Sequence, residues 1–321
     1  MLAGVAVVIA TSPFGSPGPE GSRAVPVGPT ERAGHAGHTP PSGAPGPSEP
    51  AGEDWVARTD DDALFSVDCR FSHRAGDDPI VHPGVPGASH SHEFFGSTAT
   101  DAASTGPSLR GTATTCEDAD DTAAYWVPTL LVRGVPVEPV LLRAYYRARP
   151  GVDVRDVTAP PPGLAMISGD PSATGSGSGA HGDGHAGTAG PEGVVDPGWG
   201  CGLRPRRLRA EPPTDCNDRS PLTLQLRFPD CWDGRHLDSV DHRGHVARSV
   251  DGACPSTHPV LMTELQVSVS WPVTGADGAE VTLASGAVQG AHGDFLNGWD
   301  PAALDGHIDL CVHAKANCTI G

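Results

Sequence analysis

Eight cysteines constrain this chain more than any other feature of its sequence. None of them forms a CxxC pair, and they are scattered along the chain at Cys69, Cys116, Cys201, Cys216, Cys231, Cys254, Cys311 and Cys318. A structural zinc site needs closely paired thiolates, so an even number of scattered cysteines indicates disulfides formed in an oxidising compartment. About 105 pairings are possible. Proximity along the chain favours Cys69 with Cys116, Cys201 with Cys216, Cys231 with Cys254, and Cys311 with Cys318.

The first 54 residues differ in composition from the rest. Leu2 to Ala10 is a run of small and apolar residues, too short to span a bilayer and about as long as the apolar region of a signal peptide. A basic segment before it is missing. Residues 11–54 are rich in Pro, Gly, Ser and Ala, which predicts a disordered linker or wall-spanning tether. We therefore expect residues 1–10 to direct export, and no stable membrane span to remain after processing.

The remaining residues, 55–321, have a length that suits one secreted domain. A second Gly-rich stretch, 168–198, predicts a flexible insertion within it. The formal net charge of −18 argues against a nucleic-acid partner, because phosphate binding needs clustered Lys and Arg. Residues 204–209 form the one basic run, which we interpret as a solvated loop.

Alternation of apolar and polar residues predicts antiparallel strands. The alternating apolar residues are Leu222, Leu224, Leu226 and Phe228 in one segment and Leu265, Val267, Val269 and Trp271 in another. Further strands are predicted within 65–71, 123–132, 137–147 and 281–285. Asp300 can cap a short C-terminal helix at 302–314, with Pro301 in its first turn. The predicted fold is mostly β, an antiparallel β-sandwich or jelly-roll-like structure with long loops.

Four histidine-bearing segments stand apart from the rest of the sequence. One of them, 254–259, holds His258 before a proline in extended backbone, where a structural role and a site role are equally expected. His90 and His92 stand two residues apart, so on a strand both imidazoles would face the same side and hold one metal. The segment 230–245 packs four carboxylates and three histidines into sixteen residues. This density predicts a bound cation, a polyol or a hydrogen-bond network, or else a polar loop capped by its Asp residues. The candidates from that segment are Asp233, Asp238, Asp241, His242 and His245.

The fourth segment contains His292 and Asp294 on either side of a glycine. On a Gly-containing turn, the two would serve as ligand and orienter or as acid and base. The chain lacks a phosphate-cradling Gly loop, a GxSxG elbow and an HExxH helix. These absences exclude P-loop, α/β-hydrolase and zincin interpretations.

Longer motifs follow one another in a fixed order, namely DPIV at 78–81, SHSH at 89–92, YWVP at 125–128, CWDG at 231–234, LDSVDH at 237–242, HVA at 245–247, HPV at 258–260 and HGDF at 292–295. With these motifs the chain resembles an uncharacterised family of secreted fungal and actinobacterial proteins, the domain of unknown function DUF1996. The resemblance implies an extracellular setting and no particular reaction. Fungal members joined to modules that bind cell-wall sugars imply polysaccharide surroundings. His82, His181 and His185 are not part of the resemblance and stay outside the predicted site.

Three hypotheses of function remain open. In the leading one, a metal-assisted hydrolase acts on extracellular or cell-wall polysaccharide and holds Zn, Cu or Mn through His90, His92 and one or two of His242, His245 and His292. Asp241 or Asp294 would then orient a ligand or act as general base.

The second hypothesis is a glycosidase without metal, in which two carboxylates among Asp233, Asp238, Asp241 and Asp294 flank the glycosidic bond. The third is a non-catalytic cell-wall module, in which Trp126, Trp232 and Trp299 stack on sugar rings. Convergence of the histidines around one point would favour the first hypothesis, and their dispersal would favour the third.

Overall fold

The computed structural model describes residues 63–173 and 196–320. The predicted export signal at 1–10 and linker at 11–54 lie outside these residues, as do residues 174–195 of the predicted insertion. Strands occupy both ends of that insertion, because β8 (Ala165–Gly169) includes Ser168 and β9 begins at Gly198. The bounds 168–198 predicted for the insertion were therefore too wide.

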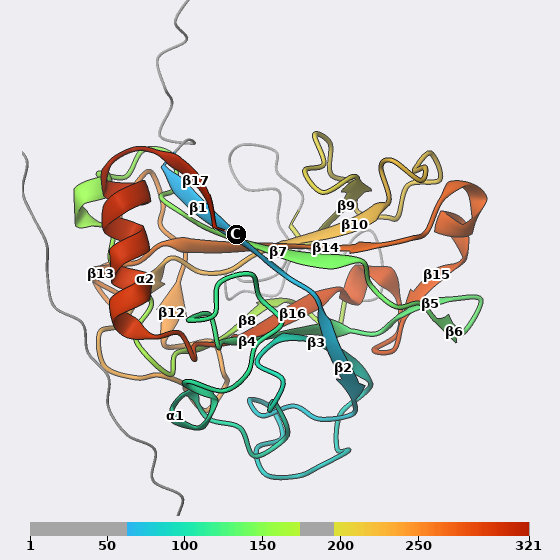
Figure 1. Cartoon of the computed structure of the whole chain (residues 1–321), viewed down its shortest axis with the longest axis horizontal. Coiled ribbons are helices and arrows are strands. Elements are labelled where there is room, and N and C mark those ends of the chain that lie inside the picture. Colours follow the sequence, from blue (N-terminus) through green and yellow to red (C-terminus); the bar gives the residue numbers. More distant parts are fainter. Residues whose placement is uncertain (1–62, 174–195, 321) are drawn as a thin grey trace, which may run out of the picture. The chain divides into compact units, whose positions relative to one another are not determined.

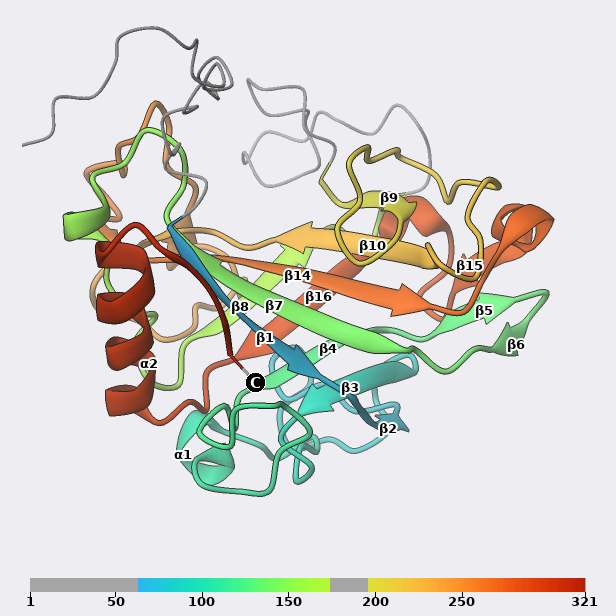
Figure 2. The same ribbon diagram turned by 45° about the horizontal axis from the view of Figure 1, so that its top comes forward.

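Two sheets, one over the other, make up the described domain (Figures 1 and 2). The six-stranded sheet has the order β17 (Asn317–Ile320), β1 (Leu64–Cys69), β7 (Leu141–Arg147), β14 (Glu264–Trp271), β10 (Leu222–Arg227), β9 (Gly198–Cys201). The five-stranded sheet has the order β2 (Phe71–Ala75), β3 (His92–Gly96), β4 (Ala124–Pro128), β16 (His292–Leu296), β8. All pairs are antiparallel except β1 with β17. The mostly β prediction is confirmed.

Smaller elements connect the sheets. Two three-stranded sheets have the orders β12 (Val246–Ala247), β11 (Cys231–Trp232), β13 (Val260–Leu261) and β15 (Val281–Leu283), β5 (Leu130–Val132), β6 (Val135–Pro136). The helices are α1 (Gly106–Leu109) and α2 (Pro301–His307), with 3₁₀ turns at Val154–Asp156, Gly275–Glu280 and Val288–Gly290. No helix among the described residues combines the length and apolar character needed to cross a bilayer.

The main core fills the space between the two large sheets. The alternating apolar residues predicted for β10 and β14 all point into it, and Leu224 and Val269 are fully buried. Tyr125 of β4 and Phe295 of β16 enter the same core from the other sheet. Period-two alternation located these strands correctly because each strand of the six-stranded sheet has one apolar face.

The C-terminal helix begins as predicted and ends earlier. The Asp300 carboxylate accepts hydrogen bonds from the backbone N–H groups of Ala302 and Ala303, each at 3.0 Å. This cap satisfies donors that the first helical turn leaves free. The α-helix ends at His307 and continues as a π-helical turn, Ile308–His313, rather than as one α-helix to residue 314.

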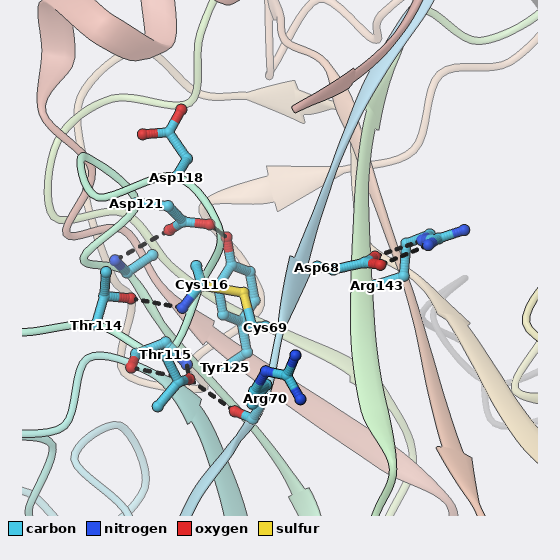
Figure 3. Close-up of a disulfide and its surroundings, with 12 residues drawn as sticks. Asp68, Cys69, Arg70, Thr114, Thr115, Cys116, Asp118, Asp121, Tyr125 and Arg143 are labelled. Atoms are coloured by element: carbon cyan, nitrogen blue, oxygen red, sulfur yellow. Dashed lines mark hydrogen bonds and ion pairs between the residues drawn. A yellow bond between two sulfur atoms is a disulfide. The ribbon is translucent and has the colours of Figure 1, made fainter. Parts of the chain in front are cut away.

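All eight cysteines form disulfides, and the four pairs favoured by proximity are confirmed. The Cys69–Cys116 bridge lies beside a buried polar network (Figure 3). The Tyr125 hydroxyl donates to Asp121 at 2.9 Å and lies 2.7 Å from the Tyr146 hydroxyl, which accepts from Trp299 Nε1. Burial raises the pKa of Asp121 well above its usual value. The network thus joins the two sheets through satisfied polar groups.

Several strands were missed by the sequence prediction, among them β3, β8, β9 and β16 of the two large sheets. They are short, and β3, β8 and β16 are buried at every position. A strand buried on both faces shows no alternation of apolar and polar residues, which removes the signal that located β10 and β14.

The inner face of β10 gives a test of this fold. We expect Leu224→Ala to lower the free energy of unfolding by about 2–5 kcal/mol, because it leaves a cavity in the main core. Leu310→Ala is the matched control, since Leu310 is 72 % exposed, and it should change stability by less than about 0.5 kcal/mol. Urea unfolding with the disulfides intact measures both. Equal losses in the two variants would contradict the assigned core.

Candidate functional site

Four strands of the five-stranded sheet, β3, β4, β16 and β8, are buried on both faces, whereas the edge strand β2 is partly exposed. One face packs into the main core, and the other carries a second apolar cluster of Ile80, Phe94, Leu109, Ala124, Trp126, Ala165, Ile167 and Leu296. On this second face a cross-strand row runs from Phe94 through Trp126 and Asp294 to Ile167. The three strands β3, β4 and β16 therefore present their side chains to one dry environment.

A row of histidines lies on the same face, one step along the strands. His92 of β3 pairs with Pro128 of β4, and His292 of β16 pairs with Gly169 of β8. His90 precedes β3 and turns toward both rings, with ring centroids 4.2 Å from His92 and 5.1 Å from His292. Nitrogen atoms of the three rings all lie within 4.8 Å of one another. Three histidines distant in sequence thus converge on one point.

Two of these rings are held by backbone carbonyls. Nδ1 of His92 lies 3.0 Å from the carbonyl oxygen of Asp77, and Nδ1 of His292 lies 2.8 Å from that of Gly290. A carbonyl can only accept, so each Nδ1 carries the proton and each Nε2 keeps its lone pair. Orientation of this kind is what holds metal-binding histidines in other proteins.

Several polar atoms at this place have no partner. Nε2 of His90, Nε2 of His92, Oδ2 of Asp294 and Nε1 of Trp126 are all buried without a hydrogen bond. Buried polar atoms in native proteins almost always have a partner, so a group of unpartnered atoms calls for an explanation. Imidazole nitrogens with free lone pairs beside a carboxylate are suited to a divalent transition metal.

Burial keeps the three imidazoles neutral. It lowers the pKa of His92 to about 3 and that of His292 to about 4, with the neighbouring His90 adding to both effects. Burial also lowers the pKa of His90, to which His82 contributes. Only neutral imidazole can bind a metal. The site is therefore prepared for ligation without loss of a proton at neutral pH.

Asp294 is a buried carboxylate that shares strand β16 with His292. It lies on β16 two residues from His292, so both side chains are on the same face, and it is 3 % exposed. Burial raises its pKa well above the usual value, and Asp78 adds to the effect, whereas Arg243 opposes it. Burial likewise raises the pKa of Asp78.

The prediction that His292 and Asp294 sit on a turn was wrong. Gly293 between them points to the opposite face, where a Cβ atom would come within 2.5 Å of Leu226 in the main core. The glycine therefore permits the two sheets to approach, and strand geometry brings the two functional side chains together. His90 also departs from the prediction, because it lies in the loop before β3 and not on the strand.

His242 and His245 do not join the three converging histidines. His245 is buried with both ring nitrogens engaged, since Nε2 donates to the Ala165 carbonyl at 2.7 Å and Nδ1 lies 3.0 Å from Ser239 Oγ. Nδ1 of His242 lies 3.0 Å from both carboxylate oxygens of Asp238. These contacts give His245 a structural role in anchoring the loop to β8.

The loop carboxylates mostly stabilise turns. Asp241 accepts hydrogen bonds from the Ser239 hydroxyl and from the backbone of Gly244, and these bonds lower its pKa. Asp233 accepts from the backbone and ring of His236; although burial raises its pKa, these bonds lower it to about 2. Asp238 accepts from the Ser239 N–H as well as from His242. The alternative of a polar loop capped by Asp residues explains this segment.

Burial also removes most of the predicted stacking surface. Trp126 is 0 % exposed and Trp299 1 % exposed, so neither can stack on a sugar ring. Trp232 is half-buried and donates from Nε1 to the carbonyl of His236. The structure therefore gives little support to the hypothesis that these tryptophans bind sugar rings.

Sequence reasoning missed the residues that surround the three histidines. Arg243 donates to the carbonyl of Gly169 at 2.7 Å, opposite His292. Gly169 has φ +85°, and a Cβ there would lie 2.3 Å from the carbonyl oxygen of Ala291. The Asp77 carboxylate holds the covering loop through the N–H groups of Gly87 and Ala102. In the sequence, only Asp78 within the DPIV motif could have indicated that this loop lies beside the histidines.

The lowered pKa values predict how stability depends on pH. His92 and His292 bind protons near pH 6.5 when unfolded but only near pH 3 to 4 when folded. The unfolded state therefore binds more protons in between, and stability of the metal-free protein should fall as the pH drops from about 6.5 to about 4. Denaturant titrations should show a shallower fall for His92→Gln. His236→Gln, at an exposed position, should keep the wild-type slope; equal slopes in all three proteins would contradict this account.

Comparison with known proteins places the chain in a family. No curated protein and no solved structure matches it significantly. One family model, described as "Domain of unknown function (DUF1996)", matches residues 78–299. The match includes the three converging histidines and Asp294, and it confirms the resemblance carried by the sequence motifs. The chain therefore belongs to the DUF1996 family.

Proposed function

We propose that this protein is an extracellular metal-dependent hydrolase of polysaccharides, with the metal bound by His90, His92 and His292. The observation that carries the proposal is the convergence of three neutral imidazoles whose Nε2 atoms include two that are buried and unpartnered. The ligand set is narrower than the sequence suggested, because His242 and His245 are committed to other contacts.

The donor set favours zinc or copper over manganese, since imidazole suits the first two and carboxylate the third. Nitrogen ligands lie about 2.0–2.1 Å from zinc, and nitrogen atoms within 4.8 Å of one another reach that geometry with a small adjustment. His92 and His292 are fixed through Nδ1, whereas His90 lies in a loop and supplies the adjustment. Three protein ligands leave a position for water or substrate oxygen, which is typical of catalytic zinc sites.

Asp294 is the residue we assign to proton transfer. Its unpartnered Oδ2 lies on the same sheet face as His292 and is shielded from bulk water. Burial and Asp78 raise the pKa of Asp294, and a cation held by the histidines would lower it again. The carboxylate would then accept a proton from the attacking water and return it to the leaving group. Asp233, Asp238 and Asp241 are less suited, since their oxygens are engaged in turns.

The extracellular setting and the substrate class belong to this proposal. Four disulfides are consistent with an oxidising compartment. We further propose that the signal predicted at 1–10 directs secretion. Residues 11–54 would then attach the domain to a cell wall. The family resemblance supports polysaccharide as substrate by association with sugar-binding modules.

Metal binding gives the first test. Wild-type protein should bind about one zinc or copper ion after chelation and reconstitution, and His90→Ala with His92→Ala should abolish that binding, since it removes two of three ligands. His181→Ala with His185→Ala is the control for weak capture by histidines of the predicted insertion, and it should bind like wild type. Inductively coupled plasma mass spectrometry and calorimetry measure stoichiometry. Wild type without stoichiometric metal would contradict the proposal.

Hydrolysis gives the second test. Release of reducing ends from cell-wall polysaccharides should depend on the metal and stop with a chelator. Asp294→Asn should reduce turnover about a hundredfold or more, because a general acid–base residue contributes on that order, while metal stoichiometry stays unchanged. Asp233→Asn is the matched control and should keep turnover near wild type. Metal binding without hydrolysis of any polysaccharide would leave the centre intact and disprove the enzymatic role.

A further inference from the structure

A second site lies on the outer face of the six-stranded sheet, away from the main core. There a cavity of about 650 Å³, open to solvent on one side, lies between the strands and the segment that follows β9. In Figure 1 the yellow segment between β9 and β10 rises on the side of the six-stranded sheet away from β4 and β16. The size is within the range of about 300–1,000 Å³ typical of ligand sites.

Polar side chains form the floor of this cavity. Gln266 of β14 pairs across the strands with Tyr145 of β7 and Arg227 of β10, and Ser268 of β14 pairs with Gln225 of β10. These five positions alternate with the apolar residues that enter the main core, so all face outward. Amide, hydroxyl and guanidinium groups thus line one continuous surface.

The floor contains donors without partners. Ser268 is 1 % exposed and its hydroxyl has no hydrogen bond, and Nε of Arg227 is buried without one. A hydroxyl hidden beneath a loop yet left unpartnered is costly, because it has lost water and gained nothing in exchange. Its position in the cavity indicates that a ligand completes its bonding.

The roof is strongly basic, although the chain as a whole carries a net charge of −18. Arg204, Arg206, Arg207 and Arg209 all line the cavity, and none of its described lining residues is acidic. Arg209 pairs with Asp215 at 3.2 Å, but across the described residues no salt bridge reaches Arg204, Arg206 or Arg207.

Arg204 also stacks over the Tyr145 ring, 5.8 Å from its centroid, and so is directed inward. The interpretation of residues 204–209 as a plain solvated loop therefore misses their position over a cavity.

We propose that this cavity binds an acidic oligosaccharide, whose sugar rings carry carboxylate or sulfate groups. The unpaired arginines supply charge-assisted hydrogen bonds to the anionic groups. The amide and hydroxyl floor suits sugar hydroxyls, which need both donors and acceptors. A nucleic acid is disfavoured, because the acidic surface repels an extended polyanion and the one aromatic ring in the cavity already stacks on Arg204.

The test uses the full chain in isothermal titration calorimetry. Two probes are acidic: a tetragalacturonate, which carries carboxylates, and a sulfated heparin tetrasaccharide. Neutral cellotetraose and a short single-stranded oligonucleotide are titrated for comparison. One acidic tetrasaccharide should bind with about one-to-one stoichiometry and more tightly than cellotetraose, and which of the two binds identifies the anionic group. Binding should weaken as salt is raised.

Variants locate the binding. Arg206→Ser with Arg207→Ser should weaken it about tenfold or more, since each loses a charge-assisted hydrogen bond. Ser268→Ala should weaken it several-fold with no loss of stability, because it removes a hydroxyl that has no internal partner. Arg70→Ser with Arg110→Ser removes the same charge at exposed positions outside the cavity and should leave binding unchanged.

The outcomes separate this site from the metal centre. The variant with His90→Ala and His92→Ala should bind the acidic tetrasaccharide like wild type. Oligosaccharide binding is therefore expected to be independent of the metal centre. Failure of both acidic tetrasaccharides to bind more tightly than cellotetraose would overturn the inference. So would tighter binding of the oligonucleotide, or equal weakening by the two pairs of arginine substitutions.

Discussion

The candidate metal centre depends on one constraint, which is the burial of β3, β4, β16 and β8 on both faces of the five-stranded sheet. One face must pack into the main core, and the other is covered by the second apolar cluster. Side chains between these layers lose water, so polar groups there need an internal partner or a ligand. This dry setting keeps His92 and His292 neutral and leaves Oδ2 of Asp294 without a hydrogen-bond partner. The same packing thus produces both the fold and the chemistry.

The two proposed sites lie on different sheets. The five-stranded sheet has apolar residues on both faces and carries the histidines within them, which suits metal ligation. The six-stranded sheet has one apolar face and one polar face, and the polar face lies beneath a basic segment. A metal centre needs few and fixed groups, whereas an oligosaccharide needs a broad polar surface. Each sheet therefore offers the kind of surface that its proposed ligand requires.

Disulfides and the buried network around Tyr125 support this arrangement at one end of the sheets. Cys69 lies where the chain leaves β1 and soon enters β2, so its bridge to Cys116 stands near the crossing from one sheet to the other. Asp121, Tyr125 and Tyr146 join the sheets through hydrogen bonds. The sulfurs of Cys69 and Cys116 lie near Asp121, but oxidised sulfur offers no thiolate, which excludes a metal there.

The amino-acid sequence by itself determined the elements with a local signal. Alternation located β10 and β14, Asp300 with Pro301 located the start of α2, and cysteine proximity identified all four disulfides. It also singled out His90, His92 and His292, because histidines in short motifs are conspicuous. It could not separate them from His242 and His245, since all five look alike until their contacts are known.

Only the tertiary structure decided which groups meet. His92 and His292 are two hundred residues apart in sequence but two strands apart in the sheet, and no local pattern encodes that order. Strands buried on both faces lose their alternation, so β3 and β16 were hidden from prediction. The basic run at 204–209 is unremarkable in sequence and acquires a role once it covers a polar sheet face. These three cases have one physical reason. Burial decides which groups are protonated and which polar atoms find a partner, and burial depends on tertiary packing rather than on local sequence.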